Sequence, residues 1–176
     1  QSALNSIANA ASQTLVLREM LQGALEQTLK VTNRPIGIVR LKGPGGRLRV
    51  AAHQGISQTY AAALDTELRV GQKALEVLSA GVVHIMDDPA PEELMGDSRV
   101  EGMRSRIWVP IQAHGRILGV LTVASREVQP FDTPETELLK AIGSIFGTAA
   151  ANAQLFEETQ TNLNRIEALR QIDQAI

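Results

Sequence analysis

The sequence contains no cysteine at any of its 176 positions. This absence excludes disulfide bonds, thiolate nucleophiles, zinc–thiolate sites and thioether-linked chromophores together. It is typical of proteins in a reducing compartment, and the N-terminal residues do not have the pattern of a signal peptide. We therefore expect a cytoplasmic location.

The sequence also lacks a strong excess of charge of one sign and any long apolar run. The formal net charge is −2, and the basic residues form no stripe. Binding to nucleic acid through its phosphates requires such a stripe, so a nucleic-acid partner is not expected. The longest apolar segments, Ile117–Ala124 and Ala141–Ala153, are well short of the ~20 residues of a membrane span, so direct membrane contact is not expected either.

No arrangement of side chains is typical of a catalytic or metal site. The three histidines, at positions 53, 84 and 114, have no spacing that indicates metal ligation. The carboxylates that follow Met86 lie in a proline-containing segment and fit a solvated loop better than an acid–base pair. We expect no catalytic residue, no metal and no cofactor. His84, in the middle of a predicted strand, keeps the alternative of a haem ligand open.

The most informative segment of the chain runs from Gly102 to Ser125. In its first half, branched apolar residues alternate with other types: Ile107, Val109 and Ile111 on one side, Arg106 and Trp108 on the other. This period of two predicts a strand with two different faces. Ala113–Arg116 is a predicted tight turn, and the apolar run Ile117–Ala124 predicts a strand that is covered on both faces.

The remaining elements are predicted from periodicity and from turn residues. We expect helices over residues 4–29 and 70–80 and from 134 onward, strands over 36–41, 47–53 and 82–86, and a short helix near 92–95 in a loop over 87–100. Leu48, Val50 and Ala52 are expected to share one face of their strand. Asp132 or Thr133 is expected to cap the last helix, with Glu135 placed as a capping-box partner for Asp132.

Three segments carry motifs that occur in this order in a known family. The hairpin reads Gly-Met-x-Ser-x-Ile-x-Val-Pro-Ile, a short turn and Gly-Arg-Ile-Leu-Gly-Val-Leu. Gly81–Asp87 is similar to a Gly-x-Pro-x-x-Ile-x-Asp strand, with Val82 and Val83 in place of the proline element. Phe131–Glu135 precedes an apolar helix. Together, over roughly residues 4 to 158, they resemble GAF domains, which are sensory modules of signalling proteins.

The resemblance implies an α+β fold with a central antiparallel sheet of about six strands. The long first and last helices are expected on one face of the sheet, and the short helices and the loop over 87–100 on the other. In GAF relatives the second face looks into a ligand cavity. The ligand-binding residues implied here are Arg106, Trp108, His84, Met86, Asp87 and Leu75.

The chain departs from several GAF subfamilies. It lacks the bilin-attaching cysteine of the photoreceptor relatives, the catalytic cysteines of the methionine-sulfoxide-reducing members and the Asn-Lys-Phe-Asp-Glu signature of the cyclic-nucleotide-binding relatives. Lys73 and Glu76 stand where the family commonly has glycine, near the pocket roof. Two hypotheses stay open for the pair of Arg106 and Trp108. The pair holds a planar or anionic guest, or Trp108 fills the cavity and Arg106 extends to solvent.

The resemblance implies a non-enzymatic sensory or regulatory domain in a larger signalling protein, such as a sensor histidine kinase of a two-component system or a nucleotide cyclase. Residues 1–158 are the expected domain, and residues 159–176 a helical linker or coiled coil that leads to a further domain. A homodimer through the terminal helices is expected, because the apolar stripe from Leu163 to Ile176 has no core of its own. The alternatives are a structural dimerisation module with a filled pocket and a non-covalent haem sensor.

Overall fold

The structure, a computed structural model, describes residues 2–66, 72–88 and 101–175. In chain order its elements are α1 (Ser2–Thr32), β1 (Ile36–Lys42), the short 3-10 helix η1 (Pro44–Gly46), β2 (Leu48–Gln54), α2 (Gln58–Thr66), α3 (Gln72–Ala80), β3 (His84–Asp87), β4 (Ser105–Ala113), β5 (Arg116–Ser125) and α5 (Thr133–Gln174). Most predicted elements are present with shifted ends. The short helix expected near residues 92–95 lies outside the described residues.

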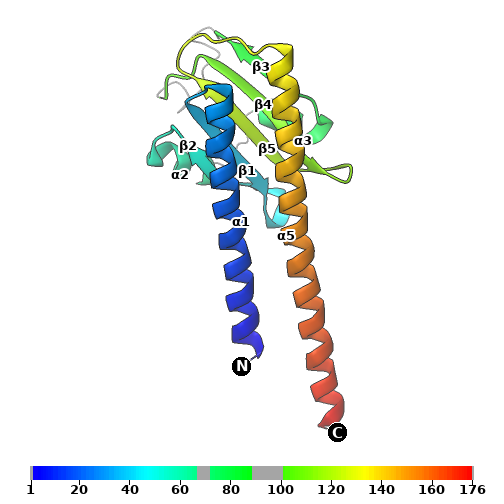
Figure 1. Cartoon of the computed structure of the whole chain (residues 1–176). Coiled ribbons are helices and arrows are strands. Elements are labelled where there is room, and N and C mark those ends of the chain that lie inside the picture. The colour runs from blue at the N-terminus through cyan, green and yellow to red at the C-terminus, as the bar shows by residue number, and fades with distance from the viewer. Residues whose placement is uncertain (1, 67–71, 89–100, 176) are drawn as a thin grey trace.

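The strands form an antiparallel sheet in the order β2-β1-β5-β4-β3. The two long helices, α1 and α5, cross one face of this sheet side by side, and the short helices α2 and α3 pack on the other (Figure 1). We call these the long-helix face and the short-helix face. The predicted α+β architecture is confirmed, with five strands in the described part of the chain where about six were expected.

The main core lies between the long helices and the sheet. Its buried side chains come from both helices, from four strands and from the segment before α5: Leu21, Leu25, Leu29, Val39, Ala52, Ile107, Val109, Ile111, Leu121, Val123, Phe131, Leu139 and Phe146. The three branched residues of β4 belong to this core, as strand alternation predicts. Trp108 belongs to a separate cluster with Ala74 and Val77 of α3. The prediction that β4 presents these two sets to opposite faces is therefore confirmed.

Helix α5 approaches the backbone of β4 through two glycines. A Cβ atom at Gly147 would overlap the carbonyl oxygen of Gln112, and one at Gly143 would overlap that of Pro110. Glycine inside a helix costs about 1 kcal/mol relative to alanine. The close approach of the two backbones provides the physical reason for placing glycine at these two positions.

An extra residue in β2 reverses its alternation. Val39 pairs with Ala52 and Arg40 with Val50, so Ala51 has no residue opposite it. Leu48 and Val50 consequently pack in the clusters under the short helices, whereas Ala52 joins the core under the long helices. The expectation that the three share a face is wrong, because a β-bulge inserts one residue and shifts the period of two.

The junction that precedes α5 is organised by a buried arginine. Asp132 caps the helix as predicted and accepts a hydrogen bond of 2.8 Å from the backbone N–H of Glu135. The Glu135 carboxylate does not return this bond to the Asp132 amide. Both of its oxygens instead accept from Arg34, each at 2.8 Å. The predicted capping box is therefore only half formed, because Arg34 offers Glu135 a charged partner.

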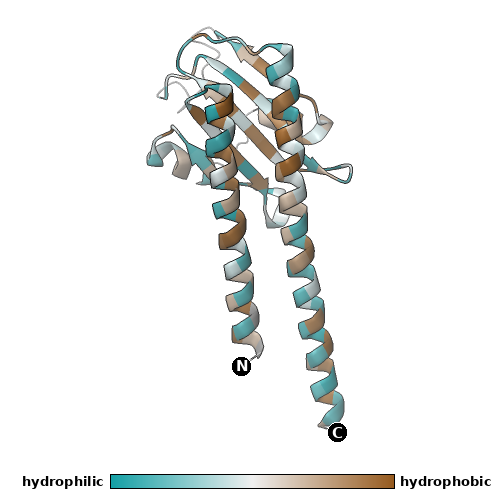
Figure 2. Ribbon diagram, in the orientation of Figure 1, coloured by the Kyte–Doolittle hydropathy of each residue, from teal (hydrophilic) through white to brown (hydrophobic). Residues whose placement is uncertain are grey.

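Both long helices extend together well beyond the sheet, and the N- and C-termini lie at the same end of the molecule (Figure 1). Hydrophobic residues are scattered among hydrophilic ones along this projecting pair (Figure 2). The exposed ones include Leu4, Ile7, Leu15, Leu155, Leu163, Ile166, Leu169 and Ile172. Within residues 2–66, 72–88 and 101–175, none of the helices combines the length and apolar character that a membrane crossing requires.

The close contact of α5 with β4 generates a first prediction. Replacing Gly147 with alanine should lower the free energy of unfolding by about 2 kcal/mol or more, because two packed backbones must separate to admit the methyl group. Gly23 of α1 is the matched control, since a Cβ atom there meets nothing within 4 Å. Gly23→Ala should stabilise by about 0.5–1 kcal/mol. Urea unfolding measures both, and equal stability of Gly147→Ala and the unmodified protein would contradict the prediction.

Candidate functional site

The side chains of Arg106 and Trp108 lie together on the short-helix face of β4. They are 8% and 7% exposed, respectively. The Cζ atom of Arg106 lies 5.0 Å from the centre of the Trp108 ring, within the range of a cation–π interaction. The expectation that Arg106 extends to solvent if Trp108 fills the space is not met, because both side chains are buried.

Strand β3 supplies two further members of the cluster. Met86 is paired with Arg106 across the strands, and His84 with Trp108. The Arg106 side chain donates a weak hydrogen bond of 3.5 Å to the Met86 sulfur. The Nε2 atom of His84 lies 2.8 Å from a carboxylate oxygen of Glu76 on α3. Four of the six residues implied by the family resemblance are therefore neighbours.

Two of the implied residues do not join this cluster. Leu75 is 55% exposed, because α3 turns Ala74 and Val77 toward the sheet. Asp87 is also exposed, since it follows Met86 in the strand and points to the opposite face. The implied roles of Leu75 and Asp87 are thus at odds with their placement. The loop expected to close the site, over residues 89–100, lies outside the described residues.

The sequence interpretation missed three residues on the same face. Thr122 of β5 pairs directly with Trp108 and is 4% exposed. Arg40 of β1 is buried there as well, and the Tyr60 side chain acts electrostatically on Arg106. A usable signal existed for two of them, since Thr122 is the one hydroxyl in the apolar run 117–124 and Arg40 the one charge in the strand predicted over 36–41.

Burial dominates the electrostatics of the cluster. Desolvation lowers the pKa of the Arg106 guanidinium from its ordinary value, and the Tyr60 phenol acts in the opposite direction. The Nε atom of Arg106 and the hydroxyl oxygen of Thr122 are both buried, and neither has a hydrogen-bond partner among residues 2–66, 72–88 and 101–175. Unpaired polar atoms of this kind are rare in folded proteins and costly. The arrangement can therefore receive hydrogen bonds from, and donate them to, a polar guest.

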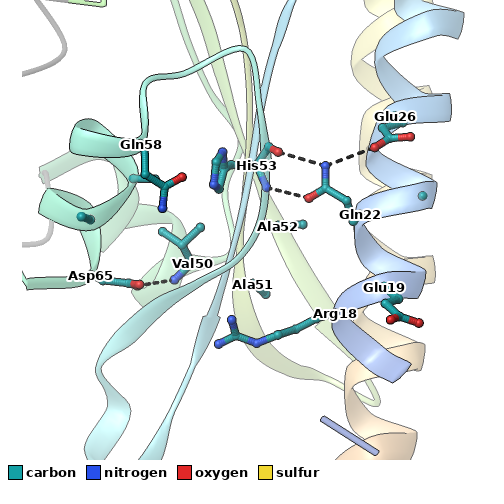
Figure 3. A pocket seen from close by; sticks show the side chains of 13 residues that line it. Arg18, Glu19, Gln22, Glu26, Val50, Ala51, Ala52, His53, Gln58 and Asp65 are labelled. Carbon is teal, nitrogen blue, oxygen red and sulfur yellow. Dashed lines mark hydrogen bonds between the residues drawn. The ribbon is translucent and has the colours of Figure 1, made fainter. Parts of the chain in front are cut away.

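A second depression lies away from this cluster, along the outer edge of β2. This edge groove has a volume of about 660 Å³ and runs between α1 and α2 (Figure 3). Its walls combine small apolar residues with charged and polar ones, and the latter are Arg18, Glu19, Gln22, Glu26, His53, Gln58 and Asp65.

Side chains already form hydrogen bonds with backbone groups of β2 that face the edge groove. The Gln22 amide donates to the His53 carbonyl oxygen at 3.0 Å and accepts from the His53 N–H at 3.2 Å. Asp65 accepts from the N–H of Val50 at 2.7 Å. These contacts protect an exposed strand edge, which would otherwise pair with another chain. The edge groove is therefore explained by the protection of β2, and the buried cluster on β4 is the better candidate site.

Metal ligands are not assembled in the part of the chain that the structure describes. No group of three or more His, Asp or Glu side chains there is placed to hold an ion. His84 is the histidine nearest to the buried cluster, and its Nε2 atom is engaged with Glu76. Arg106, Trp108 and Thr122 are suited instead to contact an organic molecule.

Comparison with known proteins places this geometry in a family. The family model described as the GAF domain matches residues 14–150, which is more than three quarters of the chain. The matched range includes the whole sheet, most of α1 and the part of α5 that packs on β4.

Solved structures with the same fold share little sequence identity with this chain. The GAF domain region of a Geobacter sulfurreducens protein superposes with a TM-score of 0.66 at 23% identity, covering 80% of this chain and 97% of that one. The PixJ GAF domain of Thermosynechococcus elongatus, in its blue-light-absorbing form, gives 0.68 at 14%, covering 88% and 96%. A type II free methionine-R-sulfoxide reductase from Thermoplasma acidophilum gives 0.66 at 16%, covering 80% and 95%. At these identities the comparisons establish the fold.

Proposed function

This chain belongs to the GAF domain family, and from that membership and the geometry of β4 we propose that it is a sensory or regulatory domain of a larger signalling protein, with the domain in the cytoplasm. A small molecule binds on the short-helix face at Arg106 and Trp108, with His84 and Met86 beside them. The terminal helices relay its presence to an output domain that follows residues 159–176.

The observation that supports this proposal is that β4 contributes side chains to both faces of the sheet. Arg106 and Trp108 project from one side of the strand, and Ile107, Val109 and Ile111 pack from the other against α1 and α5. The backbone of β4 itself touches α5 at the two glycines of that helix. A guest that shifts β4 therefore displaces α5 directly, with no mobile element between them.

Relay of this kind requires a ligand that favours one arrangement of the helices over another. A difference in binding free energy of about 1–3 kcal/mol between two arrangements is typical of such coupling. The interface of α5 with β4 is suited to this because tightly packed surfaces shift between discrete arrangements rather than deforming continuously.

We propose a non-enzymatic role. The Thermoplasma relative is named as a reductase, so the fold alone does not distinguish regulation from catalysis. This chain has no cysteine and so has no thiol to carry redox chemistry. The candidate site presents a guanidinium, an indole, a thioether, an imidazole and a hydroxyl. Among the described residues no hydrogen bond joins the His84 imidazole to the Thr122 hydroxyl, so no nucleophile is paired with a base there.

We propose that two copies associate through the projecting parts of α1 and α5. The apolar side chains along α5 beyond the sheet, Leu163, Ile166, Leu169 and Ile172, are each more than half exposed in a single chain. Helices stabilise such stripes by burying them against a partner helix. A dimer formed there joins the two relay helices and provides the surface whose geometry the ligand changes.

The dimer proposal predicts the effect of two charges on this stripe. Leu163→Glu combined with Ile166→Glu should convert the protein to a monomer at tens of micromolar, because glutamate cannot be buried unpaired at a helix interface. Sedimentation velocity measures the change, and circular dichroism should show an intact fold. Val128→Glu is the matched control, since Val128 is an exposed apolar residue outside the terminal helices. A monomeric unmodified protein at these concentrations would overturn the proposal.

The relay proposal is tested by a distance measurement that the cysteine-free sequence makes simple. Gln171→Cys introduces a single thiol on the exposed end of α5, and a spin label there reports the distance between the two copies. A panel of nucleotides, organic acids and amino acids is first screened for a raised melting temperature. Compounds that bind should change the interspin distance by a few ångströms. If no compound raises the melting temperature, or if binding leaves the distance unchanged, the sensory function is wrong.

One observation favours the alternative of a purely structural dimerisation module. Trp108 already packs against Ala74 and Val77 and fills part of the short-helix face. The haem-sensor alternative has less support, because the His84 Nε2 atom is in contact with Glu76. We expect the purified protein to show no Soret band. A Soret band that is lost on His84→Ala would establish the haem alternative instead.

A further inference from the structure

Among the residues that the structure describes, three arginines are buried, Arg34, Arg40 and Arg106, and the contrast between Arg34 and Arg106 is informative. Arg34, 3% exposed, donates five hydrogen bonds: to both carboxylate oxygens of Glu135, to the carbonyl oxygens of Gln129 and Pro130, and to the hydroxyl of Ser125. Its plane also lies 3.8 Å from the centre of the Phe131 ring. Arg34 is therefore a buried arginine with a structural role, and its guanidinium is fully hydrogen-bonded and paired with a carboxylate.

Arg106 has none of these partners. Among the described residues, its single hydrogen-bond acceptor is the sulfur of Met86, which is a weak one. Its Nε atom has no hydrogen-bond partner in the described part of the chain, although the side chain is almost as buried as that of Arg34. The centre of the Trp108 ring lies 5.0 Å from the Cζ atom of Arg106, and the ring supplies no hydrogen-bond acceptor for the guanidinium N–H groups.

A buried cation without an anion is among the most costly features that a folded protein can contain. Removing a guanidinium from water is repaid only by an opposite charge or by a full set of hydrogen-bond acceptors. The depressed pKa of Arg106, which is caused first by desolvation, reflects the same imbalance. Because arginine stays charged at any physiological pH, the imbalance cannot be relieved by loss of a proton.

A second unsatisfied group lies on the same face next to this one. Thr122 is opposite Trp108 in the register of β4 and β5, and Arg106 is paired with the next inward-facing residue of β5, Ala124. Diagonal neighbours of this kind are about 7–8 Å apart, within reach of a long side chain and a small guest between them. The Thr122 hydroxyl, like the Arg106 Nε atom, is buried without a partner.

We propose that the molecule bound at this site carries an oxyanion, a carboxylate or a phosphate, which accepts hydrogen bonds from the unpaired Nε–H of Arg106 and from the Thr122 hydroxyl. This assignment rests on the proposed sensory function and specifies its ligand class. An oxyanion matches the planar donor pattern of a guanidinium, and its charge neutralises the buried cation. A neutral ligand would leave that charge uncompensated.

The position of the cluster allows entry of such a guest. Met86 and Tyr60, which act on Arg106 from β3 and α2, are both only partly buried. The guanidinium therefore lies about one layer of side chains below the surface. The Trp108 ring beside it suits a ligand whose anionic group is attached to a flat or apolar body.

The chain contains one tryptophan, so its fluorescence reports on this site alone. Sodium benzoate and sodium phosphate are titrated into the dimeric protein, and sodium chloride at equal ionic strength and benzamide serve as controls. Benzamide has the flat ring of benzoate without its charge. At least one oxyanion should change the Trp108 emission and raise the melting temperature at low millimolar concentration. The comparison of the two anions distinguishes a carboxylate ligand from a phosphate ligand.

Two variants isolate the guanidinium and the hydroxyl. Arg106→Met keeps most of the side-chain volume and removes the buried charge, so in chloride it should melt no lower than the unmodified protein, and its affinity for the oxyanion should fall at least tenfold. Thr122→Val should reduce the affinity for the oxyanion about threefold or more. Arg104→Met, immediately before the same strand, is the matched control, because Arg104 is exposed and paired with Asp88. This variant should bind the oxyanion as the unmodified protein does.

Three results would overturn the inference. The first is an oxyanion response no larger than that of chloride and benzamide, and the second is an Arg106→Met variant that retains the response within twofold. The third is a loss of more than about 5 °C in melting temperature for Arg106→Met in chloride, which would show that the guanidinium is structural like Arg34. The proposed function survives each of them if a neutral compound still binds and moves the helices. The proposed sensory function fails on a separate result, which is that none of the nucleotides, organic acids and amino acids of the screening panel binds.

Discussion

Arg34 provides the contact on which the arrangement of the two long helices depends. It lies just after the end of α1, and its guanidinium holds Glu135 in the first turn of α5 together with the backbone of the segment between β5 and α5. Removing one partner of a buried ion pair typically costs about 3–5 kcal/mol, more than most single apolar contacts contribute. The end of α1 and the start of α5 are therefore fixed next to each other, and the rest of both helices must run side by side across the sheet.

The two faces of the sheet consequently differ in rigidity. The long-helix face combines the Arg34 junction, the largest apolar core and the contact of α5 with the backbone of β4. The short-helix face is covered by α2 and α3, helices of nine residues each, which are too short to be stable without tertiary contacts. Elements with few buried contacts open most readily. Entry of the proposed ligand is therefore expected from the side of α2 and α3, and the proposed relay runs through the packed opposite side.

Sequence patterns predicted the parts of this structure that local chemistry determines. The alternation of β4 assigned Arg106 and Trp108 to the correct face, and the turn between β4 and β5 has the positive φ values expected at His114 and Gly115. The bulge at Ala51 was not predictable, because nothing in that stretch distinguishes an inserted residue from a paired one. The partner of Glu135 was also hidden, since Arg34 is about a hundred positions away in the chain. Contacts between distant segments depend on the complete fold and cannot be inferred from local spacing.

Because α5 is long, a small tilt of the helix at its contact with β4 produces a larger displacement at its far end. From Gly147 to Gln174 the helix continues for about 40 Å, at ~1.5 Å per residue, and its far part projects beyond the sheet (Figure 1). A tilt of about 3° at its contact with β4 moves the far end by about 2 Å, which is comparable to the helix shifts found in allosteric interfaces. An uncompensated charge at Arg106 supplies a reason for such a tilt, because neutralising it changes the packing of β4 on one face only. In the proposed mechanism, the free energy that a bound anion releases is the cost of leaving the Arg106 cation unpaired in the free state.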